Sequence, residues 1–355
     1  MWGENEGNRM DQHTSIIENA IKGSLNIIEQ DREREIISRR FGLSGQKETL
    51  EQIGELLNIT RERVRQLEKA ILVRLRIGAE EGHIAELAAA EKLIIRNLTE
   101  LGRVARTTDL ANRIYDHKAT SAERAKLTFI AAISNNLTAL DENDLYYAAI
   151  GIAEYGDAKV VHERVDEVVK VIKERKEPMT IDQLDEALSY EHPDHIRAVA
   201  SISKLLATLN GLWGLAKWPT VNPRNIRDKI FVVLEAKKEP MHFSDIADAI
   251  SKSEFRRKNV TIQAIHNELI KDQRFVLIGR GIYALSSWGY TKGTVSDIIA
   301  NVLKEAHGEP LTREEIVKRV LRARKVKETT VLLNLQNKQL FTKVDKDHYT
   351  LAPED

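Results

Sequence analysis

The chain has 355 residues, of which 42% are hydrophobic and 30% charged, enough apolar material for about two to four domains with their own cores. Its 54 basic residues balance its 54 acidic residues, so no overall field draws it onto nucleic acid or acidic membranes, and binding to either must come from local clusters. The absence of cysteine excludes disulfides, thiolate zinc sites and cysteine nucleophiles. There is no signal peptide and no apolar run of membrane-spanning length, which favours a cytoplasmic protein.

Residues 1–14 are polar and acidic, and we predict a disordered lead there. From Ser15 onward, apolar residues fall on one face of a helix, at Ile16, Ile17, Ala20 and Ile21. A second helical pattern contains Ile36, Ile37 and Phe41. Gly42 is a plausible end for this second helix.

A pair of capped helices follows. Thr49 and Gln52 have the spacing of a capping box and predict a helix that turns Leu50, Ile53 and Leu57 inward. Asn58 and Ile59 form a short turn, and Thr60 caps the next helix, whose inward residues are Val64, Leu67, Ile71 and Leu75. Two short helices joined by such a turn are typical of a DNA-reading helix-turn-helix.

The outward face of the second helix carries side chains that suit DNA. Arginine can bind guanine, glutamate can accept from cytosine and glutamine can pair with adenine, which makes base readers of Arg61, Glu62, Arg65 and Gln66. Candidate phosphate contacts are Thr49, Thr60, Arg63, Lys69, Arg74 and Arg76. Residues 61–76 hold six basic and two acidic residues, a local charge of +4. The alternative is an ordinary solvated helix face. The order of capped helix, turn and capped helix favours a helix that reads DNA bases.

A weak repeat occupies the rest of the chain. Residues 165–188, 226–250 and 295–320 each contain an apolar helix, a Glu-Pro turn and a second helix. The prolines that stop the first helices are Pro178, Pro240 and Pro310, and the candidate caps of the second helices are Thr180, Ser244 and Thr312.

A third helix and a short aromatic hairpin complete each repeat. The hairpins lie at residues 211–218, 280–285 and 346–351, and a less regular copy runs from 91 to 150. Three helices followed by a two-stranded wing is the winged-helix order. We therefore predict a mainly α protein with a helix-turn-helix at 15–80 and tandem winged helices with β-hairpin wings at 86–155, 159–218, 223–290 and 291–355.

Three segments resemble region 4 of the primary bacterial sigma factors. They are residues 31–43 (DREREIISRRFGL), 49–54 (TLEQIG) and 60–68 (TRERVRQLE). In that family the helix that corresponds to residues 60–68 reads the −35 promoter element, and region 4 docks on the β flap of RNA polymerase. The resemblance implies that Arg61, Glu62, Arg65 and Gln66 read bases. It also implies that Phe41 and its neighbours belong to the surface that supports or meets the flap.

The chain departs from that family in two ways. Ala70 and Val73 stand where a positive charge is frequent, which puts some backbone or activator contacts in doubt. The residues before Ser15 are too few for region 2, which melts the −10 element. We therefore expect a regulator with a promoter-reading module rather than a complete initiating sigma factor.

The C-terminal repeats resemble HARE-type winged helices, similar to the amino-terminal domain of the RNA polymerase δ subunit. The Glu-Pro turns and aromatic wings carry this resemblance. Winged helices bind DNA or proteins, and basic groups that can touch phosphates are Arg256, Arg257, Lys258, Arg319, Arg322, Arg324, Lys325 and Lys327. An ordinary solvated face is the alternative. Packing is the natural role of Trp213, Trp218 and Trp288.

No motif of a catalytic site is present, and we predict no enzyme, no small-molecule substrate, no cofactor and no metal. His192 and His195 are the closest histidines, and they have no third ligand and Pro193 between them. Gly279 to Gly281 is a hairpin turn more naturally than a phosphate cradle.

The leading hypothesis is a nucleoid-associated transcription regulator that binds a −35-like element in double-stranded DNA and contacts core RNA polymerase, with the β flap as the expected docking site. The alternative is a polymerase-binding protein, similar to the δ subunit or competing with a sigma factor, with little direct DNA readout. A restriction or repair accessory protein is a third, remote hypothesis.

Overall fold

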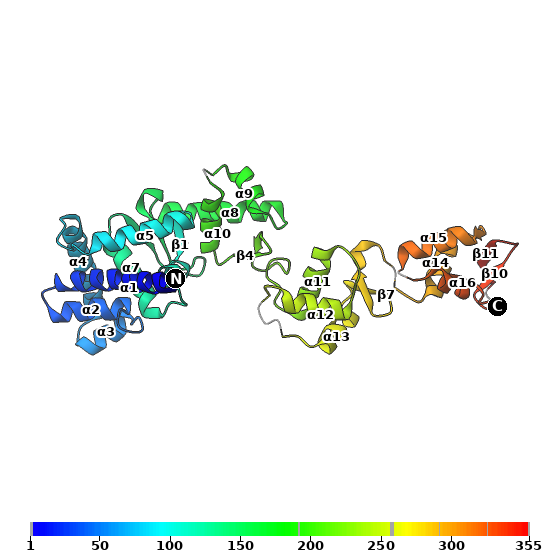
Figure 1. Ribbon diagram of the computed structural model, residues 1–355, viewed down its shortest axis with the longest axis horizontal. Helices are drawn as coiled ribbons and strands as arrows, with labels where there is room; N and C mark the ends of the chain where they lie inside the picture. The colour runs from blue at the N-terminus through cyan, green and yellow to red at the C-terminus, as the bar shows by residue number, and fades with distance from the viewer. Residues whose placement is uncertain (1–2, 191, 256–258, 291, 325, 354–355) are drawn as a thin grey trace. The chain divides into compact units, whose positions relative to one another are not determined.

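The structure, a computed structural model, describes all residues except 1–2, 191, 256–258, 291, 325 and 354–355. The chain divides into two compact units, Met1–Lys217 and Trp218–Asp355, each of which is described by itself (Figure 1). Both are built mainly from helices with small antiparallel sheets, as the sequence predicted. Among the helices described, none has the length and apolarity that crossing a membrane requires.

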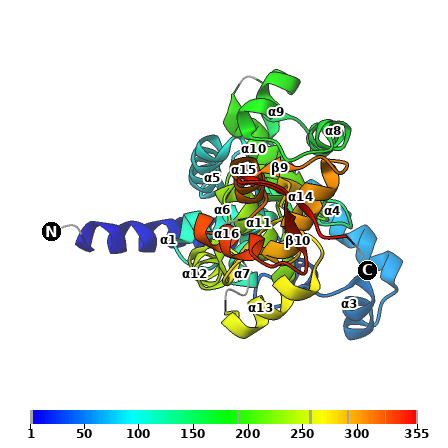
Figure 2. The ribbon, with the colours of Figure 1, turned by 90° about the vertical axis from the view of Figure 1, so that its right-hand side faces the viewer.

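The first unit opens with four helices. They are α1 (Gly3–Asn26), α2 (Asp31–Phe41), α3 (Leu50–Leu57) and α4 (Arg61–Glu80). The disordered lead predicted for residues 1–14 is wrong where the structure describes it, because α1 begins at Gly3 and its first turns project from the unit (Figure 2). Ile17, Ala20 and Ile21 are buried and attach this helix to the core.

A winged helix follows in the same unit. Its elements are α5 (Leu87–Leu101), β1 (Val104–Arg106), α6 (Thr107–Tyr115), α7 (Ser121–Ile133), β2 (Leu137–Leu140), β3 (Ala149–Ile152) and the 3-10 turn η1 (Ala153–Tyr155). The sheet has the order β1-β3-β2 with both pairs antiparallel. The less regular copy of the repeat therefore has the winged-helix order of elements.

The second winged helix completes the first unit. It contains α8 (Ala158–Arg175), α9 (Ile181–Leu188), α10 (Pro193–Ile202), β4 (Leu206–Leu209) and β5 (Leu212–Leu215). The hairpin β4–β5 is antiparallel, and Met179 bridges to Trp213 on its second strand. Trp213 is 7% exposed and therefore packs in the core, as predicted.

The second unit contains two further winged helices. The first consists of α11 (Ile226–Lys237), β6 (Met241–His242), α12 (Phe243–Lys252), α13 (Ile262–Lys271), β7 (Phe275–Gly279), β8 (Ile282–Leu285) and η2 (Ser286–Trp288). The second consists of α14 (Val295–Glu305), β9 (Leu311–Thr312), α15 (Arg313–Ala323), α16 (Glu328–Leu335), β10 (Phe341–Lys343) and β11 (His348–Leu351). Their sheets have the orders β6-β8-β7 and β10-β11-β9.

The caps of the repeated second helices agree with the prediction in two cases. Thr180 caps α9 and Thr312 caps α15 through their hydroxyl groups. Ser244 is not the cap of α12. Instead, the ring of His242 accepts from the Ser244 backbone N–H. The helix begins at Phe243, directly after β6, so Ser244 already lies in its first turn.

One hydrophobic core joins three of the opening helices, α1, α2 and α4, to the first winged helix. It contains Ile17 of α1, Leu75 of α4, Ile94 of α5 and Phe129 of α7, each of them fully buried. The core is therefore continuous across residues 80–86, where the sequence placed a boundary. The helix-turn-helix is held by the winged helix that follows it.

Candidate nucleic-acid interface

The turn between α3 and α4 has the tight geometry of a helix-turn-helix. Thr49 and Gln52 form the predicted capping box, and Asn58 ends α3 in the left-handed conformation at φ 51°. A Cβ atom on Gly54 would lie 2.7 Å from the carbonyl oxygen of Ile59, so only glycine lets the chain turn this closely. The turn therefore fixes the direction in which α4 leaves α3.

Buried residues fix the rotation of α4 about its own axis. Val64 and Leu75 are fully buried and Ile71 is 1% exposed, as the predicted apolar stripe requires. Val64 packs with Ile36 of α2 and Ile53 of α3 in a small core under the turn. Because these residues face inward, the first two turns of α4 present their other side to solvent.

The four predicted base readers lie together on that solvent face. Arg65 donates to both carboxylate oxygens of Glu62, at 2.8 and 2.6 Å, and Gln66 donates to Glu62 at 3.4 Å. Arg61 forms an ion pair of 2.7 Å with Glu51 of α3. Hydrogen bonding from Arg65 holds the pKa of Glu62 below its ordinary value. These four side chains are thus held by bonds to each other and to Glu51, and any base contact would have to replace those bonds.

The predicted phosphate contacts divide into two groups. Thr49 and Thr60 are helix caps, and Arg63 and Lys69 are exposed and form no ion pair within the described part of the chain. By contrast, Arg74 pairs with Glu33 of α2, and the Nε of Arg76 donates to the carbonyl of Ala132 on α7 at 2.7 Å. Arg74 and Arg76 therefore already hold α4 in place, and the first group is better placed for phosphate.

One anchoring pair was not identified from the sequence. The Nε of Arg40 lies 3.1 Å from both carboxylate oxygens of Glu68, and both side chains are largely buried. This pair ties α4 to α2 about one turn beyond the predicted base readers. No local pattern predicts it, because the two residues lie 28 positions apart.

Phe41, which the resemblance placed in the surface that supports or meets the flap, is half-buried. Its ring packs edge-on against Phe129 of α7, with centroids 5.1 Å apart, and it lies against the shared core. The winged helix that follows covers this face of the helix-turn-helix. The part of Phe41 that packs on Phe129 is therefore not available to a docking partner in this arrangement.

The second helix of a helix-turn-helix pair is the one that enters a DNA groove, and in the first winged helix this is α7. It contacts α1, α2 and α4, and Leu127, Ile130 and Ile133 are fully buried. Lys126 of α7 pairs with Glu18 of α1. In this arrangement α7 serves as a packing element and has no free face for DNA.

The corresponding helix of the second winged helix, α10, is also used for packing. Ile196 and Val199 are fully buried, and α10 lies against β1 and α5 of the first winged helix. A Cβ atom on Gly102 would approach the carbonyl oxygen of Asp194 to 2.4 Å, and Arg106 donates to the carbonyl of Ser201. The first and second winged helices are thus closely joined.

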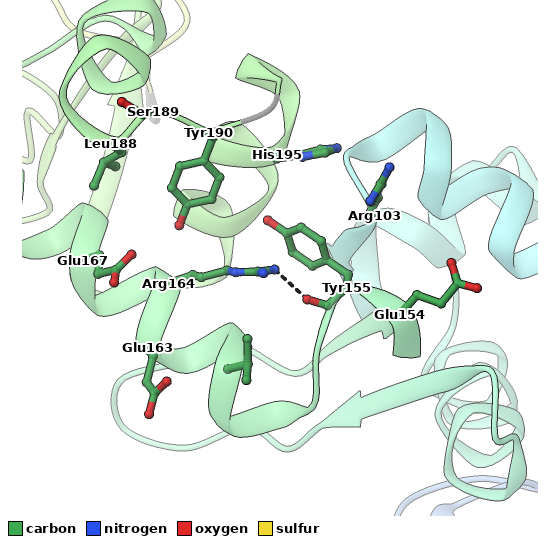
Figure 3. Close-up of a pocket in the computed structure, with 11 residues that line it drawn as sticks. Arg103, Glu154, Tyr155, Glu163, Arg164, Glu167, Leu188, Ser189, Tyr190 and His195 are labelled. Carbon is green, nitrogen blue, oxygen red and sulfur yellow. Dashed lines mark hydrogen bonds between the residues drawn. The ribbon is translucent and has the colours of Figure 1, made fainter.

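A cavity of about 500 Å³ lies at this junction, and Figure 3 shows the side chains that line it. The rings of His195 and Tyr155 meet edge-on at 5.5 Å, and Arg164 lies 4.0 Å over the Tyr155 ring and donates to its carbonyl at 2.6 Å. His195 is therefore a packing residue, and His192 caps α10 by accepting from the Asp194 N–H. Within the described residues no group of three or more His, Asp or Glu side chains is arranged to hold a metal.

The basic residues proposed from the C-terminal repeats have different environments. Arg256, Arg257, Lys258 and Lys325 lie outside the described residues. Arg319 pairs with Glu315 at 2.7 Å, and Arg324 is partly buried and donates to the carbonyl of Gly293. Arg322 and Lys327 are exposed.

The fold and its exposed α4 define a helix-turn-helix protein with appended winged helices. Residues 30–76 match the family model of Sigma-70, region 4, and residues 225–288 match that of HARE-HTH, the ASXL and restriction endonuclease HTH domain. These matches confirm the two resemblances seen in the sequence and associate the chain with DNA binding and transcription.

Curated relatives match the same N-terminal part. RNA polymerase sigma factor SigA1 of Synechococcus elongatus is 41% identical over 63 residues, 18% of this chain and 16% of that protein. SigA of Nostoc sp. is 50% identical over 46 residues, 13% of this chain and 12% of that protein. The chloroplastic sigF of Arabidopsis thaliana is 42% identical over 62 residues, 17% of this chain and 11% of that protein. The likeness thus covers less than a fifth of either partner.

Proposed function

We propose that this protein is a sequence-specific DNA-binding transcription regulator of the nucleoid that recognises a −35-type promoter element through α4. One observation carries the proposal: the first two turns of α4 expose Arg61, Glu62, Arg65 and Gln66 on one face, while Val64 anchors the opposite face. These side chains are of the types that read base edges in the major groove. The sigma factor relatives match the same segment.

The positive charge near the reading face supports the same proposal. Arg63 and Lys69 are exposed on α4, where they can neutralise phosphates on either side of a bound groove. The N-termini of α3 and α4, capped by Thr49 and Thr60, add backbone N–H groups that favour anions. Phosphate contacts would set the position of the helix, and the four exposed readers would set the sequence.

RNA polymerase is the partner that the sigma factor likeness suggests. The β flap is the specific docking site implied by that likeness, and the covered Phe41 counts against a flap contact on this face. The same observation counts against the alternative of a polymerase-binding protein with little DNA readout. We therefore place DNA recognition first and polymerase contact second in the proposed function.

Selection from randomised duplexes tests the proposal. The full-length protein is incubated with a pool that contains a random hexamer flanked by constant DNA, and bound molecules are sequenced. We expect enrichment of a −35-like hexamer. The control variant Lys170→Ala, on an exposed position of α8, should enrich the same sequence. Recovery of the pool without any enriched hexamer would refute sequence-specific recognition.

A further inference from the structure

A cavity of about 490 Å³ lies between the helix-turn-helix and the first winged helix, and we call it the α4 cavity. Side chains of α2 and α4 line it from the helix-turn-helix, and side chains of α7 and β2 line it from the winged helix. These four elements share the core that contains Leu75 and Phe129, so the cavity lies within one packed unit. Its volume is in the range of small-molecule sites, which is about 300–1,000 Å³.

Apolar side chains from three elements contribute to the wall of the α4 cavity. They are Phe41 of α2, Leu72 of α4 and Leu137 of β2. Phe41 and Leu72 are half-buried, so the protein leaves part of each side chain uncovered. Covering this surface with a ligand removes it from water, which is favourable. A ligand that suits the cavity therefore has an apolar body.

The charged side chains of the lining leave an excess of positive charge. They are Arg40, Lys47, Glu68, Arg76 and Asp141, three cations and two carboxylates with a net charge of +1. Arg40 and Glu68 neutralise each other, since the Nε of Arg40 lies 3.1 Å from both carboxylate oxygens. Arg76 is exposed and donates to a neutral backbone carbonyl of α7, and exposed Lys47 forms no ion pair with a described residue. One anionic group on the ligand would balance this charge.

The α4 cavity borders the contacts that hold α4 in place. Glu68, Leu72 and Arg76 follow one another at intervals of four residues and therefore form one face of α4. On this face, Glu68 ties α4 to α2 through Arg40, and Arg76 ties it to α7 through the carbonyl of Ala132. A ligand that contacts this face and β2 would bridge α4 to the winged helix. Its binding would reinforce the arrangement in which the base readers are exposed.

We propose that the α4 cavity binds a small organic anion, whose charged group pairs with Arg76 and Lys47 and whose apolar body packs against Phe41 and Leu72. The ligand is an effector: it holds α4 in its present position and thereby strengthens DNA binding. This regulatory effect rests on the proposed function of α4, whereas binding in the cavity does not. A small molecule suits the cavity better than a protein partner because of its volume and because Phe129 already covers part of Phe41.

A fluorescent organic anion tests the binding site. Anilinonaphthalenesulfonate joins an aromatic body to one sulfonate, and its emission rises when it leaves water for an apolar surface. We expect saturable binding of this probe to the full-length protein. Phenylnaphthylamine has the same aromatic body without the sulfonate, and it should bind roughly tenfold more weakly because it cannot pair with the two cations.

Substitutions at the two cations locate the bound probe. Lys47→Ala, at an exposed loop position, should weaken sulfonate binding about two- to fivefold and leave unfolding unchanged. Arg76→Met should reduce the preference for the sulfonate, and Arg76→Lys should retain it, because lysine keeps the charge. Lys170→Ala, on an exposed position of α8, is the matched control and should bind as the wild type does. Equal affinities of the Lys47 and Lys170 variants, or equal binding of the two probes, would overturn the proposal.

Linkage between the probe and DNA tests the effector role. Saturating anilinonaphthalenesulfonate should tighten binding of the selected duplex by roughly fivefold or more, and the duplex should tighten probe binding by the same factor. If the probe binds in the cavity and leaves DNA affinity unchanged, the effector role is overturned. If the probe binds with the expected variant pattern but no hexamer is selected, the α4 proposal fails and the binding site stands. If a hexamer is selected and the probe does not bind, only the cavity proposal fails.

Discussion

The ring of Phe41, at the end of α2, meets the ring of Phe129 in α7 edge-on at a centroid distance of 5.1 Å. This contact joins the helix-turn-helix to the first winged helix across 88 positions of sequence. It lies in the core that also contains Leu75 of α4. Helix α4 therefore shares its core with residues of the first winged helix, which help to hold it in place.

The Phe41–Phe129 contact should appear as a coupling energy. Phe129 is fully buried, so Phe129→Ala should cost about 3–5 kcal/mol of stability, and the half-buried Phe41→Ala less. In a double-mutant cycle the pair should show a coupling of about 0.5–1.5 kcal/mol. Denaturant unfolding of the four proteins measures it, and strictly additive losses would show that the rings do not interact.

Gly102 should control the junction between the first and second winged helices. Its φ is +96°, and a Cβ there would meet the Asp194 carbonyl at 2.4 Å, so Gly102→Ala should force α10 away from β1. Gly211→Ala is a matched control, because its φ is +78° but nothing lies within 4 Å. We expect Gly102→Ala to cost about 1–3 kcal/mol more than the control, measured by denaturant unfolding. Equal losses would mean that the junction is looser than the structure indicates.

Tyr146 should make the first unit sensitive to alkaline pH. Burial, and then a hydrogen bond of 2.7 Å to Asp166, raise the pKa of Tyr146 from 10.0 to about 12. Because the folded state favours the protonated phenol, the contribution of Tyr146 to folding stability is complete below pH 10. This contribution is lost as the pH rises toward 12. The stability of the wild type relative to Tyr146→Phe should therefore fall above pH 10, by up to about 1.4 kcal/mol per pH unit. Unfolding midpoints that stay parallel from pH 8 to 11.5 would contradict this.

Thr60 should stabilise the start of the reading helix. Its hydroxyl accepts from the backbone N–H of Arg63 at 3.2 Å. Thr60→Ala should cost about 1 kcal/mol of stability and weaken binding to all duplexes alike, whereas Thr60→Ser should retain most of both. Unfolding and binding titrations on the same samples measure the two effects. A loss confined to one hexamer would instead make Thr60 a base reader.

Local patterns predicted the helix-turn-helix of α3 and α4 well. The capping box of Thr49 and Gln52, the Thr60 cap and the buried Val64 all depend on spacings of a few residues, and the structure has each of them. The wings were predicted in part: aromatic residues and glycines mark the turn and the second strand of each hairpin, whereas the first strands, β4, β7 and β10, lie before the predicted segments. The cap of α12 was missed because His242 is an unusual cap and Ser244 has a more common cap side chain.

Those local patterns could not predict contacts between residues that lie far apart in the sequence. Nothing near Phe41 in the sequence indicates Phe129, and nothing near Arg74 or Arg76 indicates Glu33 or the Ala132 carbonyl as partners. Periodicity shows which face of a helix is apolar, but it does not show which element covers the other face. For this reason only the structure revealed that α7 packs on Phe41, in the face that the resemblance assigned to the polymerase flap.

The most direct test of sequence reading by α4 is a base-by-base measurement of specificity. Affinity of the full-length protein is measured for the selected hexamer and for all single-base changes of it, with the wild type, Arg65→Ala and Gln66→Ala. We expect each substitution to remove about 1–3 kcal/mol of discrimination at one base pair and to leave the other positions unchanged. If both variants keep the wild-type preference at every position, α4 does not read the sequence.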